Sequence, residues 1–165
     1  ASDVYKRQLN GERAPFYSPD ARAGFFGISP HTTRAQLQRA VFEGLAFAIV
    51  DALQGYPQGG ELYLTGGGAA SATWLQIIAD CTGRTVVSSA FNELSARGAA
   101  ILAARSVAAL AETPPLAQTR YQPRPQAHAR YAALYPVYRL LREQMLPVWQ
   151  ARQAALQPLS QDLQP

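Results

Sequence analysis

Residues 61–80 read Glu-Leu-Tyr-Leu-Thr-Gly-Gly-Gly-Ala-Ala-Ser-Ala-Thr-Trp-Leu-Gln-Ile-Ile-Ala-Asp, and the rest of the chain is organised around this stretch. Residues 62–64 form a short apolar run with strand character, whereas the apolar residues of 74–79 recur at helical spacing. Three glycines at 66–68 stand between them. This order predicts a strand, a glycine turn and a helix, and we expect Ser71 to cap that helix.

A glycine turn between a strand and a helix is typical of phosphate-binding sites. Because glycine has no Cβ, its backbone can adopt a positive φ and a polyanion can approach its N–H groups. The first turn of the following helix adds unpaired N–H groups and the positive end of the helix dipole. A tight turn that binds no ligand fits the same residues equally well, so these residues alone leave both interpretations open.

Other folds that bind a ligand at a glycine-rich turn can be compared with this stretch. A Walker A loop requires a lysine after its glycines, but the only lysine of the chain is Lys6. A Rossmann-type dinucleotide-binding domain requires a third glycine and an acid after the next strand, whereas Ser71 and Ser88-Ser89 occupy those places. This alternative is therefore weak. A noncatalytic nucleotide-binding or interaction domain is a further alternative, and a closed surface beside residues 66–69 would favour the interaction domain.

Composition limits the class of protein. With 165 residues, 48% of them hydrophobic, the chain can form one globular domain with a sizeable core. The net charge of +4 comes from scattered residues without a basic run, so we expect no nucleic acid partner. No apolar run reaches about 18 residues and no secretory segment opens the chain, which favours a cytoplasmic protein without a membrane partner. Cys81 is the single cysteine, and we expect it in the core.

The flanking regions divide the chain into three parts. Residues 1–8 lack a hydrophobic period, and we interpret them as a foreign leader, such as a sequence-assembly junction, outside the fold. Residues 9–156 form the domain, and residues 157–165 are expected to be a frayed tail. Within the loop at 11–20, we expect Arg13 to form an ion pair with a structural role rather than a phosphate contact.

The longest helix expected in the first half of the chain runs from Thr33 to about Leu53, because apolar residues recur there at spacings of three and four. Glu43 lies next to the apolar face, where an ionised carboxylate must be paired or hydrogen-bonded. We expect Glu43 to hold a neighbouring loop rather than to act in catalysis. His31 precedes the helix without an acidic or cysteine neighbour, and we expect it to face solvent or to cap.

The second half of the sequence predicts a strand, two helices and an irregular connector. Residues 85–87 read as a strand, and residues 93–110 as an alanine-rich helix in which Gly98 permits close packing. Proline-rich segments from 114 to 125 indicate an irregular connector. A last helix is expected to begin at His128, with aromatic residues in the core, and Pro136 should kink or start it.

Four blocks of the sequence resemble motifs of the FGGY carbohydrate kinases, which include xylulose, glycerol, gluconate and ribulose kinases. Residues 23–43, with a small residue, an aromatic, Gly27 and Ile28 before the helix, resemble the C-terminal signature of this family. Residues 9–15 are similar to its Gly-Glu-Arg-x-Pro loop, 65–80 to its glycine and tryptophan block, and 95–104 to its Arg-Gly-Ala-Ala-Ile-Leu-Ala-Ala helix. The tryptophan block looks more like the xylulose kinase branch than the glycerol kinase branch.

The resemblance implies an α/β fold: an actin/hexokinase-like (ribonuclease H-like) C-terminal lobe, N-terminally truncated, in which a mixed sheet packs against helices. In this family ATP lies between two lobes and the sugar is held mainly by the N-terminal lobe. The resemblance places the nucleotide beside five residues of the turn, with the glycines next to phosphate or ribose and the serine near adenosine: Gly66, Gly67, Gly68, Ala69 and Ser71. Ala70 departs from the pattern, because many members have lysine there.

The resemblance also implies which parts of the chemistry are absent. The catalytic aspartate and most ligands of Mg²⁺ belong to the family's N-terminal lobe, and none of Asp20, Asp51 or Asp80 lies in a matching motif. We therefore expect the ATP-binding lobe of a carbohydrate kinase, most similar to xylulose kinase, that is inactive alone. Its partners would be ATP, ADP and a sugar or polyol. An uncovered sheet edge leads us to expect association, with which a homodimer is compatible.

Overall fold

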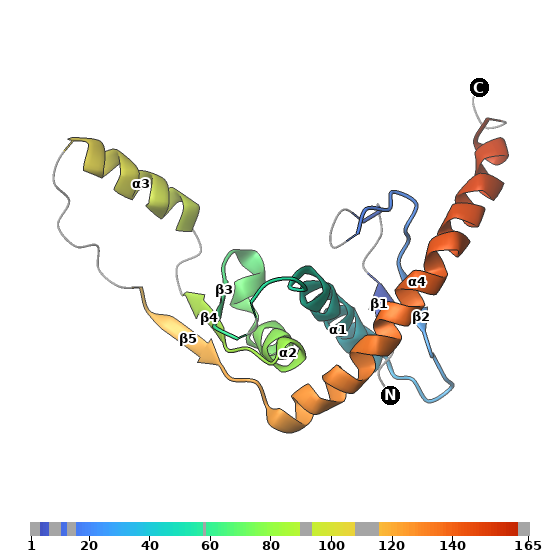
Figure 1. The fold of residues 1–165 in the computed structure, drawn as a ribbon, viewed down its shortest axis with the longest axis horizontal. Helices are drawn as coiled ribbons and strands as arrows, with labels where there is room; N and C mark the ends of the chain where they lie inside the picture. Colours follow the sequence, from blue (N-terminus) through green and yellow to red (C-terminus); the bar gives the residue numbers. More distant parts are fainter. Residues whose placement is uncertain are drawn as a thin grey trace.

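The computed structural model of the protein describes residues 4–6, 11–12, 16–57, 59–89, 94–107 and 116–161. Strands and helices alternate through most of this part of the chain (Figure 1). The elements in chain order are β1 (Val4–Lys6), β2 (Gly24–Phe26), α1 (Arg34–Ala52), β3 (Leu62–Leu64), the 3₁₀ turn η1 (Gly67–Ala70), α2 (Ala72–Thr82), β4 (Val86–Ser89), α3 (Leu94–Val107), β5 (Gln118–Tyr121) and α4 (Pro125–Gln161). Within these residues, no helix combines the length and the apolar character needed to cross a bilayer.

A mixed three-stranded sheet carries the glycine turn. β3 and β4 pair in parallel, with Leu62 opposite Val86, and β5 pairs antiparallel to the other side of β4. Parallel strands require a crossover, which η1 and α2 supply. The predicted order of strand, glycine turn and helix is therefore confirmed, as is the strand expected near residues 85–87.

Helix α2 lies at the centre of the core. In Figure 1 it lies between the sheet and helices α1 and α4. Ile78 and Ala79 are fully buried, and Cys81 is buried as expected from the sequence. The buried cluster joins residues of α1, α2, β4 and α4: Ala46, Phe47, Leu75, Ile77, Ile78, Ala79, Cys81, Val86, Tyr131 and Tyr138.

The start of α1 is set by a reciprocal cap. The Thr33 Oγ1 accepts a hydrogen bond from the Gln36 N–H at 3.3 Å, and the Gln36 Oε1 accepts one from the Thr33 N–H at 2.7 Å. These two bonds satisfy donors that the first turn would otherwise leave unpaired. The helix expected from Thr33 to Leu53 is confirmed, and His31 is exposed as expected.

Helix α4 is joined to α2 by a buried carboxylate. Asp80, which is fully buried, accepts hydrogen bonds from the Arg124 backbone N–H at 2.8 Å, the Arg124 guanidinium at 2.5 Å and the Gln76 amide at 3.0 Å. Burial acts to raise the pKa of this carboxyl, but the bonds from Arg124 and Gln76 outweigh it and hold the pKa below its usual value. The start of α4 is thereby fixed against α2.

The last helix differs from the expectation at both ends. It begins at Pro125 rather than at His128, because proline has no N–H to lose and a fixed φ that suits the first helical position. The His128 N–H donates to the Arg124 carbonyl oxygen at 2.9 Å, which closes the first turn. The helix does not start at Pro136, and it continues to Gln161, past the residue where a frayed tail was expected.

Three other expectations need correction. The view that residues 1–8 lie outside the fold is wrong for Val4–Lys6, which pair antiparallel with β2 through backbone groups that require no side-chain pattern. The connector expected between the last two helices contains β5, whose mostly exposed side chains show no apolar alternation. A Cβ added at Gly98 would meet no atom within 4 Å, so this glycine makes no close contact among the described residues.

Helix α3 itself is confirmed, and it lies apart from the sheet in Figure 1. Arg13 lies outside the described residues.

We predict that Asp80→Asn lowers the free energy of unfolding by about 2–3 kcal/mol at pH 7. This loss is smaller than that expected on breaking a fully buried ion pair, because the Arg124 side chain is largely exposed. Since the pKa of Asp80 is lowered by folding, its contribution is present above the unfolded-state pKa of about 3.9 and is lost as the pH falls through the folded-state value. Urea unfolding at neutral and acidic pH measures both effects. Glu143→Gln, which removes a half-exposed carboxylate, is the control and should change stability little. An equal loss in both variants would contradict the assignment.

We also predict that the 165-residue chain self-associates. Among the described residues β3 has a ladder partner on one side only, and the Tyr63 side chain is exposed. An edge strand of this kind can pair with another chain. Sedimentation velocity should show concentration-dependent association that Tyr63→Lys reduces, because a charged side chain opposes edge pairing. A monomer at all concentrations would contradict this prediction.

Candidate functional site

The glycine turn connects β3 to α2 by a sharp change of backbone direction. Gly66 adopts φ 84° and ψ −171°, which an L-residue with a Cβ rarely adopts. Gly67 and Gly68 then enter η1, in which the Ala69 N–H donates to the Gly66 carbonyl oxygen at 2.9 Å. The conformational need for glycine therefore lies at Gly66 alone of the three.

The next two glycines are not required by contacts within the chain. A Cβ at Gly67 would meet no atom within 4 Å, and a Cβ at Gly68 would make an ordinary contact of 3.5 Å with the Trp74 indole nitrogen. Both residues are exposed. As the first residues of η1 they have no acceptor within this turn for their N–H groups. The turn is thus exposed at two residues whose N–H groups have no acceptor within it.

The inner side of the turn is held by β4 and α2. The Ser88 hydroxyl donates to the Ala69 carbonyl oxygen at 3.3 Å, and the Ser71 Oγ accepts from the Trp74 N–H at 3.3 Å. Ser71 therefore caps α2, as its position after the glycines predicts. The Trp74 ring in turn packs against Phe42 of α1, with 5.6 Å between ring centroids. These contacts fix the turn while its outer side stays open.

The open turn bears on two alternatives raised by the sequence. A closed surface beside residues 66–69 would favour an interaction domain, but Gly67 and Gly68 are exposed. A Rossmann-type sheet would continue with parallel strands, whereas β5 is antiparallel to β4. The antiparallel β5 argues against the Rossmann-type alternative, and the exposed turn lacks the closed surface that would favour an interaction domain.

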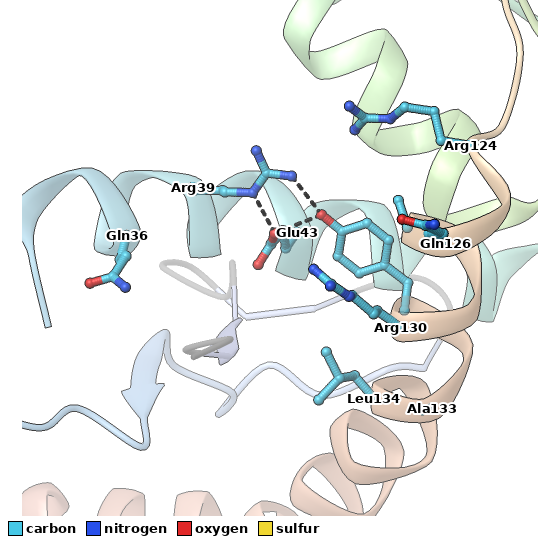
Figure 2. A pocket seen from close by; sticks show the side chains of 10 residues that line it. Gln36, Arg39, Glu43, Arg124, Gln126, Arg130, Ala133 and Leu134 are labelled. Atoms are coloured by element: carbon cyan, nitrogen blue, oxygen red, sulfur yellow. Dashed lines mark hydrogen bonds and ion pairs between the residues drawn. The ribbon is translucent and has the colours of Figure 1, made fainter.

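Two clefts are lined in part by the same residues, Arg39 and Arg124. One, of about 350 Å³, reaches the first turn of α2 and is lined by Arg39, Ala72, Thr73, Gln76, Ile77, Tyr121 and Arg124. The other, of about 670 Å³, lies between α1 and α4 (Figure 2). Sequence reasoning missed both clefts because their walls come from helices far apart in the chain.

Glu43 is buried at the larger cleft, and the expectation that its carboxylate is paired is confirmed. It accepts hydrogen bonds from the Arg39 Nε and the Tyr131 hydroxyl, each at 2.7 Å, and Arg39 also donates to the Tyr131 oxygen at 2.8 Å. Burial raises the pKa of Tyr131, so its hydroxyl stays protonated as a donor. Glu43 thus holds helix α4 rather than the loop that the sequence suggested.

Two of the acidic residues considered from the sequence, Asp80 and Asp51, have structural partners. Asp80 is bound by Arg124, and Asp51 is buried between the Tyr135 hydroxyl and the Arg142 guanidinium. The part of the chain that the structure describes contains no group of three or more His, Cys, Asp or Glu side chains placed to hold a metal ion. These carboxylates therefore serve to hold helices together.

Comparison with solved structures defines the class of protein. The chain resembles a "xyloylose kinase" from Brucella ovis with a TM-score of 0.77 and 30% identity, over 90% of this chain and 32% of that one. It resembles the xylulose kinase from Rhodospirillum rubrum with a TM-score of 0.73 and 29% identity, over 90% and 32% of the two chains. The fold is thus that of part of a carbohydrate kinase, which confirms the expected α/β lobe.

Sequence comparison leads to the same class and to the family. The model of the FGGY family of carbohydrate kinases, C-terminal domain, matches residues 4–107, so the chain belongs to this family. The xylulose kinase of Escherichia coli K12 is 33% identical over 151 residues, which are 85% of this chain and 31% of the relative. The erythritol kinase of Brucella abortus is 35% identical over 149 residues, 84% of this chain and 28% of that protein. The chain therefore spans about a third of the length of these relatives.

Proposed function

We propose that this chain is the ATP-binding lobe of an enzyme that transfers the γ-phosphoryl group of ATP to a hydroxyl of a sugar or polyol, most similar to xylulose kinase. The observation that carries the proposal is Gly67, a glycine with a helical backbone and open space around its missing Cβ. Neither the backbone conformation nor packing within the chain requires glycine there. The close approach of a ligand would explain why this position has no side chain.

The chain's own residues fit a nucleotide. Gly67 and Gly68 are exposed and open the 3₁₀ turn, so their N–H groups would be available to phosphate oxygens. Ala69 is held by Ser88, which keeps the donors in place while a ligand binds. Ser71 starts α2, where adenosine would lie. Bound ATP supplies the phosphoryl group, and the chain's part is to bind and orient it.

The sugar, the base that accepts the hydroxyl proton and most ligands of Mg²⁺ are assigned to a part of the enzyme outside this chain. Mg²⁺ is proposed as the ion that accompanies the phosphates of ATP, since phosphoryl transfer requires neutralisation of their charge. The relatives named for xylulose and erythritol support a sugar or polyol as acceptor. We further propose that the complete enzyme is a cytoplasmic homodimer.

The proposal predicts that Gly67→Val in the full-length protein weakens binding of an ATP analogue at least about tenfold, or 1.4 kcal/mol, and leaves sugar binding nearly unchanged. A Cβ added at Gly67 meets no atom of the chain within 4 Å, so the substitution should act mainly on the ligand. Calorimetric titration with each ligand separately measures both affinities.

Gly66→Val is the matched control for this experiment. It forces a β-branched residue into a positive φ at a cost of about 1 kcal/mol or more, so it should lower the melting temperature, whereas Gly67→Val should change it less. Unchanged nucleotide affinity in a folded Gly67→Val protein would refute the site.

A further prediction concerns activity. The 165-residue chain alone should show no sugar-dependent release of ADP with pentoses, polyols or gluconate, because the base and the metal ligands proposed for the reaction are not encoded in it. A coupled ADP assay of the pure chain, with the full-length protein as the positive control, measures this. Turnover by the chain alone would show that a base lies among its own residues.

A further inference from the structure

The larger of the two clefts is formed where the first half of α1 faces the first turns of α4. Figure 2 shows Arg39 and Gln36 on one wall, while Arg124, Gln126 and Arg130 extend from the other wall toward them. Its volume of about 670 Å³ is in the range of small-molecule sites. None of the residues of the glycine turn lines this cleft.

Three guanidinium groups line this cleft together with one carboxylate. Glu43, the carboxylate, is occupied by Arg39 and Tyr131. Asp80 lies fully buried behind Arg124. The charge exposed in the cleft is therefore positive.

Two of the arginines are held from behind by buried acids. Arg39 uses its Nε and Nη2 for Glu43 and Tyr131, and Arg124 uses its Nε and Nη2 for Asp80. No described residue is shown to accept from the Nη1 group of either arginine, so this group can donate elsewhere. A guanidinium that is already fixed loses little freedom when it binds an anion, and its planar donors suit phosphate oxygens.

The other residues of the cleft suit the remainder of a small ligand. Ala127, Ala133 and Leu134 provide an apolar wall, and the Gln126 amide adds a polar group. A phosphate ion alone would fill only a fraction of about 670 Å³. We propose that this cleft is a second ligand site, which binds a small phosphate ester, with Arg39, Arg124 and Arg130 on the phosphate and the apolar wall on the carbon skeleton.

Direct binding to the full-length protein tests this proposal without reference to kinase activity. The probes are ribose 5-phosphate, inorganic phosphate and ribose, titrated by calorimetry. We expect ribose 5-phosphate to bind more tightly than inorganic phosphate, and Arg130→Ala to weaken both about tenfold, as expected for the loss of a charged hydrogen bond. Arg130 is exposed, so the variant should keep its melting temperature.

Two matched variants complete the experiment. Arg152→Ala removes the same charge from an exposed position farther along α4 and should leave binding unchanged. Gly67→Val should also leave it unchanged, which separates this site from the proposed nucleotide site. Binding that is unaffected by Arg130→Ala, or equally weakened by Arg152→Ala, would overturn the proposal. Equal affinities for phosphate and ribose 5-phosphate would overturn the ester as its ligand.

Discussion

The buried carboxylate of Asp80 is the interaction on which the arrangement of the helices depends. A fully buried carboxylate is tolerated only when its oxygens are hydrogen-bonded, and here they accept from Gln76 and from both the backbone and the side chain of Arg124. Because Arg124 directly precedes α4, this interaction sets where that helix starts. Asp80 also contacts His128 of this helix, whose Nδ1 lies 2.9 Å from the Asp80 carbonyl oxygen.

Two further carboxylates of α1 repeat this principle along α4. Glu43 is bound by Tyr131, and Asp51 is bound by Tyr135 and Arg142. A long helix is thus held to its neighbours by polar contacts as well as by the aromatic cluster around Phe47. The larger cleft lies between the helices that these contacts join, α1 and α4, and the smaller one is lined by α2 with residues of α1 and β5.

The glycine turn shows how conformation and ligand binding can require the same residue type for different reasons. Gly66 is needed for its positive φ, whereas the backbone of Gly67 is ordinary and its surroundings are empty. A run of glycines in a sequence does not separate these two causes, because both select the residue without a Cβ. The structure separates them, and it gives the nucleotide proposal its sharpest test.

The sequence by itself determined the local elements and the family. The period of apolar residues was enough for α1 and α2, and the position of Ser71 after the glycines was enough for its cap, because both depend on neighbours within a few residues. Only the tertiary structure decided the position of β5, whose exposed side chains carry no pattern and which exists through backbone pairing with β4. It likewise decided the distant partners, Tyr131 for Glu43 and Arg124 for Asp80, which lie 88 and 44 residues away. Contacts over such separations arise from the packing of whole elements, which no local spacing of residues records.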